Sequence, residues 1–450
     1  MLRPASRVTY FMQASLRLLT HRKFLPLFVT QFLGAFNDNL FKTAMILFAT
    51  FTVFKDPRQE SSFNAIATGL FILPFFLLSA LSGQLADHMD KAKIIRIVKL
   101  AEIGIMLVGG LGLLLCETFP LTGVALMLVA VLAMGVHSTF FGPIKYAILP
   151  QHLDDDHVLG GTGLVEAGTY IAILAGTIVA GWIDPPLAAG AVLLLAVIGY
   201  FSGRMVPPAP RLGPPVNLDF NMFRASWRLI NATMHIRRLF LAIMSISFFW
   251  MIATVLVIIF PPLVKNDFTA SKEVASMFLA IFSVGVAVGS VAINRLLQGH
   301  VSARYAPISV LMMGAFIWFF EYVSGSWVTA PAGTYYTVSE FVAQPHSWRV
   351  LFALFGIAVF GGMFVVPLYA FMTTTVAKHE TARTVAANNV VNSGAMVFGA
   401  LVILAATGAG LSNRLALLVV VVMCVFSALL AIMLQRACDR ERRTAAERLP

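Results

Sequence analysis

Residues 83–93 read Gly83-Gln84-Leu85-Ala86-Asp87-His88-Met89-Asp90-Lys91-Ala92-Lys93. This polar stretch separates two apolar runs, 61–86 and 94–116, and about 20 mostly apolar residues are enough for a helix that crosses a bilayer. Gly83 permits close helix packing, while Asp87 can pair with positive groups or with a helix N-terminus. The pattern therefore predicts a tight loop between two membrane helices, with a conformational latch formed by Gly83, Asp87, Lys91 and Lys93.

The rest of the chain repeats this alternation of apolar runs and polar loops. Of its 450 residues, 59% are hydrophobic and 12% are charged, whereas a soluble globular domain carries roughly 25% charged residues. This composition excludes a soluble fold and predicts an all-α membrane protein. Twelve runs are candidate transmembrane helices: 24–54, 61–86, 94–116, 118–144, 167–183, 185–203, 239–264, 274–294, 305–323, 350–377, 384–413 and 415–435.

Two longer polar segments interrupt the rhythm. Residues 204–238 are basic and proline-rich, which is typical of a linker between two six-helix halves, and residues 324–348 form a second loop rich in Tyr, Trp and Pro. No cleavable signal peptide is predicted, because no small-residue cleavage site follows the basic N-terminus. The predicted organisation is an N-terminal segment at 1–23, a half at 24–206, a linker at 207–238, a half at 239–436 and a tail at 437–450.

The distribution of positive charge predicts the orientation. Of the 32 lysines and arginines, 25 fall on the two tails and on alternate loops, including 87–99. Since lysine and arginine accumulate on the cytoplasmic side, both termini are expected in the cytoplasm. The net charge of +11 is then topogenic and lipid-facing, and does not indicate nucleic-acid binding. The three cysteines are far apart and predict neither a disulfide framework nor a metal site.

Charged residues inside the first run are candidates for a polar site. Asp38 lies near the middle of residues 24–54, where a carboxylate costs several kcal/mol unless it faces protein or water. Lys42 is one helical turn further on and on the same face, so the two side chains form a self-neutralising structural pair, a site for a charged substrate group, or a gate. Asn37 and Asn39 add hydrogen-bonding capacity.

Two further polar clusters occur at the ends of later runs. Lys145 and Tyr146 close the fourth run at the expected cytoplasmic boundary, and are either substrate-binding or a snorkelling interfacial pair. Glu166, near the cytoplasmic end of the fifth run, is a candidate partner of Lys145 or Arg383. The eleventh run opens with a polar cluster that serves either the substrate or helix–helix hydrogen bonding, namely Arg383, Asn388, Asn389 and Asn392. Other intramembrane polar residues are Glu102, His137 and Glu321, and the histidine is interpreted as a packing residue.

The 83–93 stretch resembles the signature loop of the major facilitator superfamily, G-x-L-a-D-r-x-G-r-k, and it falls at the loop expected for that superfamily. Two positions depart from the signature: Asp90 replaces the usual Gly, and His88 replaces the usual Arg. The resemblance implies a major facilitator fold of two six-helix halves.

Three further stretches together resemble the bacterial lysophospholipid transporter family: residues 31–40, 140–151 and 386–392, which read QFLGAFNDNL, FFGPIKYAILPQ and AANNVVN. Membership implies a flippase in the bacterial inner membrane, and the protein is expected to be a monomer. It would move lysophosphatidylethanolamine and lysophosphatidylglycerol from the outer to the inner leaflet for reacylation. It would contact membrane lipids, and a cytoplasmic acyltransferase or acyl-carrier-protein ligase is a candidate partner.

Two other functions remain open at this point. One is a proton-coupled exporter of small molecules within the same superfamily, with Asp38, Glu102 and Glu166 as possible proton carriers. The other is a membrane scaffold for a lipid acyltransferase. The chain itself is not expected to be an enzyme, because none of its nine histidines is followed five positions later by the aspartate that acyltransferases of this pathway use. No cofactor is implied, since a GxxxxGK[ST] loop for ATP is missing.

Overall fold

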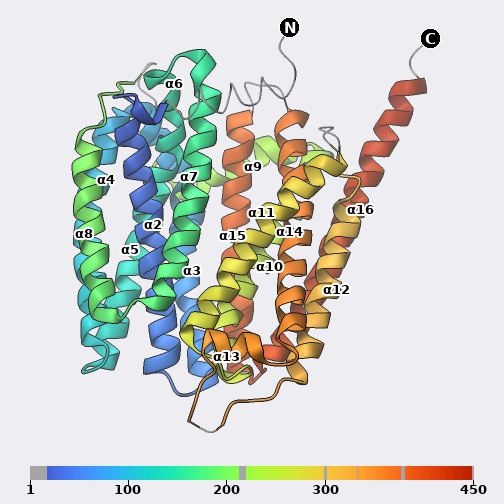
Figure 1. The fold of residues 1–450 in the computed structure, drawn as a ribbon. Helices are drawn as coiled ribbons and strands as arrows, with labels where there is room; N and C mark the ends of the chain where they lie inside the picture. Colours follow the sequence, from blue (N-terminus) through green and yellow to red (C-terminus); the bar gives the residue numbers. More distant parts are fainter. Residues whose placement is uncertain (1–17, 212–218, 298–301, 332, 377–380, 448–450) are drawn as a thin grey trace. The chain divides into compact units, whose positions relative to one another are not determined.

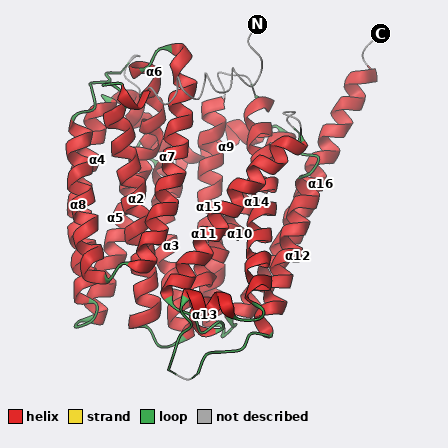
Figure 2. Ribbon diagram, in the orientation of Figure 1, coloured by secondary structure: helices red, strands yellow, loops and turns green. Residues whose placement is uncertain are grey.

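The computed structural model describes residues 18–211, 219–297, 302–331, 333–376 and 381–447. In these residues the chain is almost entirely helical, with helices joined by short loops (Figures 1 and 2). It divides into two compact units. The first comprises Met1–Met45 and Leu78–Met222, and the second comprises Ile46–Leu77 and Phe223–Pro450. Helices α2 and α3 therefore each have residues in both units.

The helices of the first predicted half begin where the sequence supplies a start signal. Pro120 and Pro185 open α5 and α8, since proline is well suited to the first helical turn. The elements are η1 (Leu18–Thr20), α2 (Leu25–Phe48), a π-helical turn (η2, Ala49–Val53), α3 (Pro57–His88), α4 (Lys91–Leu115), α5 (Pro120–Ala147), α6 (Leu149–His152), α7 (Asp155–Trp182) and α8 (Pro185–Arg204).

The second unit is built around α10, whose side chains are the most deeply buried of the membrane-length helices described. Helices α11, α14, α15 and α16 all pack against it. The elements here are α9 (Met222–Met234), α10 (Arg237–Asn266), α11 (Lys272–Leu296), α12 (Ala306–Gly325), α13 (Val338–Ala343), α14 (Ser347–Thr375), α15 (Thr381–Gly408) and α16 (Asn413–Glu447).

Eleven helices in the described residues are long and apolar enough to cross a membrane. They correspond to the second to twelfth predicted runs, which confirms the all-α membrane protein. The helix on the first run, α2, has 24 residues and is thus about 36 Å long. It is not among the eleven, because its polar residues lower its hydropathy. The exact number of twelve spans stays a prediction.

Asp90, which departs from the signature loop, has a structural role that glycine lacks. Its carboxylate caps α4 by accepting hydrogen bonds from the backbone N–H groups of Ala92 (2.8 Å) and Lys93 (3.3 Å). The same oxygen accepts from the N–H of Ala209 (3.1 Å), and the Ala209 carbonyl accepts from the N–H of Lys91 (3.0 Å). Asp90 thereby fastens the start of the linker to the N-terminus of α4.

The 324–348 loop covers one end of the second unit and contains α13. Trp327 stacks on Phe341 with ring centroids 4.7 Å apart and contacts Phe268 edge-on at 5.1 Å. Thr337 and Glu340 form a capping box at the start of α13. Trp327 and Phe341, which the sequence shows as part of a polar loop, therefore pack together with Phe268 in an ordered cap, while Tyr335 and Trp348 are exposed.

Asp267, which follows the last residue of α10, gives the second unit a dependence on pH. Burial raises the pKa of this carboxyl to about 6, although Arg414 opposes the shift. Because the pKa is higher than in the unfolded chain, ionisation weakens the fold, and stability is lost as pH rises through about 6. A folded-state pKa about two pH units above that of the unfolded chain corresponds to a loss of about 3 kcal/mol of folding free energy once the carboxyl is ionised. Partial exposure of Asp267 reduces this loss to about 1–2 kcal/mol.

We therefore expect Asp267→Asn to stabilise the protein by about 1–2 kcal/mol at pH 8 and by much less at pH 4.5. Thermal unfolding in detergent at the two pH values measures this difference. The exposed Asp439 supplies the control, Asp439→Asn, which should change little at either pH. An equal gain for Asp267→Asn at both pH values would show that charge is not the cause.

Candidate polar translocation site

One face of α2 carries a stripe of polar side chains. Gln31, Asp38 and Lys42 are spaced by seven and four residues, which places them within about 40° of one another around the helix and over about 16 Å of its length. The Asp38 carboxylate accepts a hydrogen bond from the hydroxyl of Ser138 on α5 (2.6 Å). Its other oxygen is buried and has no hydrogen-bond partner among the described residues. Lys42 lies within electrostatic reach of Asp38.

A second face of α2 meets a fully buried carboxylate, Glu102 of α4. Three side chains hold it: Lys99 of the same helix (Nζ to Oε2, 2.5 Å), His137 of α5 (Nε2 to Oε2, 3.3 Å) and Asn37 of α2, which donates to Oε1 (3.0 Å). Because each partner comes from a different place in the unit, Glu102 joins α2, α4 and α5. His137 is thus a buried packing residue that also contacts the Glu102 carboxylate.

Lys99 was counted with the cytoplasmic loop 87–99 although it also falls in the predicted run 94–116, and the structure supports the second placement. Its side chain is completely buried inside the first unit, so the count of positive loop residues on the expected cytoplasmic side falls by one. Glycine makes room for it: a Cβ at Gly34 would lie 2.5 Å from Nζ of Lys99, and one at Gly203 would lie 3.4 Å from its Cγ. The i, i+3 spacing of Lys99 and Glu102 is a sequence signal for the pair, although it does not reveal the tertiary partners.

The structure brings Lys145, Tyr146 and Glu166 together between α5 and α7. The Tyr146 hydroxyl donates to the Glu166 carboxylate (2.5 Å), and Lys145 donates to the Thr169 hydroxyl (3.2 Å) while its ammonium lies 4.9 Å from the centre of the Tyr146 ring. The Thr169 hydroxyl in turn donates to Gln31 (2.8 Å). This cluster therefore continues the α2 stripe toward the end of α5.

Loss of the Tyr146 hydroxyl should disturb this cluster measurably. A hydrogen bond to a charged acceptor contributes about 1.5–3 kcal/mol, so Tyr146→Phe is expected to destabilise the protein by about 1–2 kcal/mol, given partial exposure, and to slow transport. Thermal unfolding and transport rate are the measurements. Tyr322→Phe, at an exposed position of α12, is the matched control. If the two variants unfold at the same temperature and transport at the same rate, the Tyr146 hydroxyl does not contribute to the site.

A separate polar network lies inside the second unit. Ser247 of α10 donates to the Asn392 amide (2.7 Å), Asn392 donates to the Tyr369 hydroxyl (3.2 Å), and Trp250 donates to the same hydroxyl (2.8 Å). Asn388 is fully buried beside Tyr369. Asn392 thus helps to join α10, α14 and α15, in line with the helix–helix interpretation. The polar atoms of the Asn388 side chain are buried without a hydrogen-bond partner in the described part of the chain.

The remaining candidates lie apart from these clusters or are only partly described. Asn389 is exposed on α15, and the Asn39 amide donates to the Ala35 carbonyl of its own helix (2.8 Å). Lys91 is buried and Lys93 exposed in the first turn of α4. A Cβ at Gly83 would meet no described atom within 4 Å. Arg383 and Asp87 lie on α15 and α3, but their side chains are outside the described residues.

A buried ion pair that sequence reasoning missed lies in the second unit. Lys265, in the last turn of α10, contacts the Glu60 carboxylate of α3 (2.5 Å), and both side chains are at most 8% exposed. Lys265 also donates to the backbone carbonyls of Thr50 (2.5 Å) and Phe54 (2.8 Å) at the π-helical turn that ends α2. The pair therefore fastens the segment Ile46–Leu77 to α10. The sequence separation of 205 residues hides this contact.

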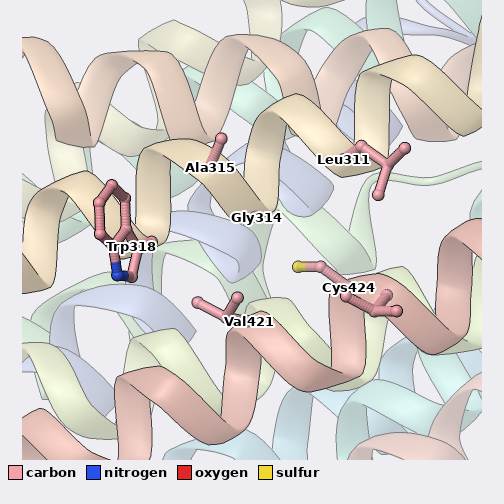
Figure 3. Close-up of a pocket in the computed structure, with 7 residues that line it drawn as sticks. Leu311, Gly314, Ala315, Trp318, Val421 and Cys424 are labelled. Atoms are coloured by element: carbon pink, nitrogen blue, oxygen red, sulfur yellow. The ribbon is translucent and has the colours of Figure 1, made fainter.

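A cavity of about 240 Å³ lies between α12 and α16 (Figure 3). Trp318 and Leu311 flank it on α12, and Val421 and Cys424 on α16. The lining offers no charged group, so this cavity does not provide a site for a polar head group. The polar groups of the first unit stay the better candidates.

Comparison with known proteins identifies the family. A sequence model of the Major Facilitator Superfamily matches residues 27–337, well over half of the chain. The chain belongs to the major facilitator superfamily. It is a multi-pass membrane transporter, and not an enzyme.

Relatives within the superfamily are lysophospholipid transporters. The chain is 26% identical over 371 residues to "Lysophospholipid transporter LplT" of Serratia proteamaculans, covering 79% of this chain and 80% of the relative. It is 25% identical over 354 residues to the protein of the same name from Photorhabdus laumondii, covering 76% and 78%. These similarities support the predicted resemblance and a bacterial inner-membrane location.

Solved structures of major facilitator transporters share the fold. The crystal structure of a D-xylose–proton symporter matches with a TM-score of 0.63 and 14% identity, over 91% of this chain and 97% of the other. A POT family transporter in complex with 5-aminolevulinic acid matches with a TM-score of 0.67 and 11% identity, over 92% and 96%. At these identities the similarity establishes the major facilitator fold alone.

Proposed function

We propose that this transporter moves lysophospholipids from the outer to the inner leaflet of the bacterial inner membrane, where a separate acyltransferase–ligase reacylates them. The relatives named lysophospholipid transporter support this cargo. The structural observation that carries the proposal is the polar stripe of α2, which places a carboxylate and an ammonium group, Asp38 and Lys42, inside the helix bundle. A lysophospholipid has the matching chemistry, namely a charged head and a single acyl chain.

The stripe offers a contact for each part of a zwitterionic head. The buried oxygen of Asp38 that has no hydrogen-bond partner in the described part of the chain is an acceptor for an ethanolamine ammonium. Lys42 and Lys145 are donors for the phosphate, and charge-assisted hydrogen bonds of this kind are the strong ones. The acyl chain needs no polar partner, and remains against apolar side chains or lipid.

Reconstitution of the purified protein tests the cargo. Fluorescent lysophosphatidylethanolamine is added to proteoliposomes, and its removal from the outer leaflet is followed by extraction with albumin. Transport should be faster than in empty liposomes, and unlabelled lysophosphatidylethanolamine should compete while the diacyl lipid should not.

A second candidate function is proton-coupled export of small molecules, which the buried carboxylate of Glu102 beside His137 favours. The same assay separates the two functions. Lack of competition by lysolipid, together with transport of another solute that an uncoupler abolishes, would replace the lysolipid proposal with the exporter.

A further inference from the structure

The helix inside the linker, α9, exposes aromatic side chains along one edge. It is more strongly amphipathic than any of the membrane-length helices. Phe223 and Trp227 are 70% and 69% exposed, and Phe220 just before the helix is 70% exposed. A neighbouring side of α9, about 90° around the axis from the two rings of the helix, is covered, with Ser226 and Thr233 buried. A group of exposed aromatic side chains on one edge of a helix marks a surface that contacts another protein or a membrane.

Positive charge adjoins the aromatic edge. Successive residues of an α-helix are turned by about 100° around its axis. The midpoint between Phe223 and Trp227 therefore lies about 100° around α9 from the midpoint between Arg224 and Arg228. Both arginines are exposed. Residues 219–238 contain four arginines and a single acidic residue, Asp219. Aromatic rings beside arginines form the pattern of a helix that lies in the plane of a membrane interface, with its rings among acyl chains and its cations at the phosphates.

The position of α9 in the chain places it at such an interface. Met234 ends α9, and Arg237 begins α10, a 30-residue candidate span. Three residues reach at most about 11 Å, so the end of α9 cannot lie far from the membrane boundary. Met234 and Ile236 pack against the core of the second unit, which limits the freedom of the connection.

We infer that α9 is a lipid-binding interfacial helix that docks the linker onto anionic phospholipid head groups through Arg224 and Arg228, with Phe223 and Trp227 inserted among the acyl chains. The occupant is a lipid surface and not a protein, because the aromatic and cationic edges are arranged as a bilayer interface is, apolar next to anionic. Each arginine near an anionic surface strengthens association about five-fold.

Trypsin cleavage of the full-length protein in nanodiscs tests this docking. Nanodiscs of pure phosphatidylcholine are compared with nanodiscs that contain 30% phosphatidylglycerol. Cleavage after Arg224 and Arg228 should slow about 25-fold in the anionic nanodiscs, from about five-fold per arginine. Cleavage after the exposed Arg211 of the same linker, outside α9, should be equal in both and serves as the internal control.

Two variants distinguish the parts of the surface. Phe223→Ser/Trp227→Ser should abolish the protection, Arg224→Gln should reduce it at the remaining Arg228 from about 25-fold to about five-fold, and Arg211→Gln should leave it intact. Equal cleavage at Arg228 in the two lipid compositions would overturn the anionic-lipid inference. Protection in native membranes but in neither nanodisc would overturn it in favour of a protein partner.

A nitroxide at Phe223→Cys, on a background with Cys116, Cys424 and Cys438 replaced by alanine, gives a readout that does not depend on proteolysis. It should be more accessible to oxygen than to a water-soluble nickel complex in anionic vesicles, while a nitroxide at Arg211→Cys should show the reverse. A nitroxide at position 223 as accessible to nickel as that at 211 would contradict insertion. None of these readouts depends on the identity of the cargo.

Discussion

Replacement of Lys99 by methionine is expected to destabilise the first unit by about 3–5 kcal/mol, because it leaves the Glu102 carboxylate buried without its closest cation. The Glu102 side chain is 2% exposed and that of Lys99 is completely buried. Asn37 and His137 then have to hold the carboxylate alone. Thermal unfolding in detergent measures the loss.

The double variant Lys99→Met/Glu102→Gln separates a buried-charge effect from a packing effect. Removal of both charges should recover most of the lost stability, since a buried ion pair is often replaced by neutral residues at little cost. Lys93→Met, at an exposed position of the same helix, should change stability by less than about 0.5 kcal/mol. A neutral Lys99→Met would contradict the role of Glu102 as the point that joins α2, α4 and α5.

Lys265→Met is the second change with a large expected effect. Glu60, completely buried, would lose its ion pair, and the carbonyls of Thr50 and Phe54 would lose a donor. The expected loss is about 3–5 kcal/mol. The segment Ile46–Leu77 avoids part of this loss if it detaches from α10. Detachment would expose position 61, which is buried in the wild type, so a cysteine introduced as Ser61→Cys should react faster with maleimide in the Lys265→Met background.

Lys55→Met provides the matched control for this lock. Lys55 lies on the same segment but is exposed, so its replacement should leave both unfolding and the maleimide reaction at Ser61→Cys unchanged. Unchanged labelling and stability in Lys265→Met would mean that the ion pair does not hold the segment.

Hydropathy predicted the architecture well, because the lipid solvent imposes long apolar runs that can be read from the sequence alone. It also located Asp38 and Lys42, since charges inside such a run are rare. The predicted partnership of Lys145 and Glu166 was only approximate: Tyr146 contacts Glu166, and Lys145 contacts Thr169.

Contacts that depend on how helices pack were beyond the sequence. Lys99 was counted with the loop 87–99 although it also falls in the run 94–116, and its burial against Gly34 of α2 and Gly203 of α8 could not be read from the sequence. Asp90 also accepts a hydrogen bond from the N–H of Ala209, and this contact can be predicted only if the return of the linker to α4 is known. Helix α9 was missed because its 13 residues are too few and too polar for a hydropathy search tuned to membrane spans.

The central claim is that the α2 stripe carries the head group of a lysophospholipid, and Asp38→Asn tests it most directly. Transport of lysophosphatidylethanolamine and lysophosphatidylglycerol is measured in proteoliposomes for the wild type, for Asp38→Asn and for the control Asn39→Ala, whose amide donates to the Ala35 carbonyl of its own helix. Loss of a contact between opposite charges worth about 1.5–3 kcal/mol slows transport about 10- to 100-fold. We predict this loss for the ethanolamine lipid, a smaller one for the glycerol lipid, which has no ammonium, and near-normal rates for Asn39→Ala. Wild-type rates for both lipids in Asp38→Asn would contradict the account.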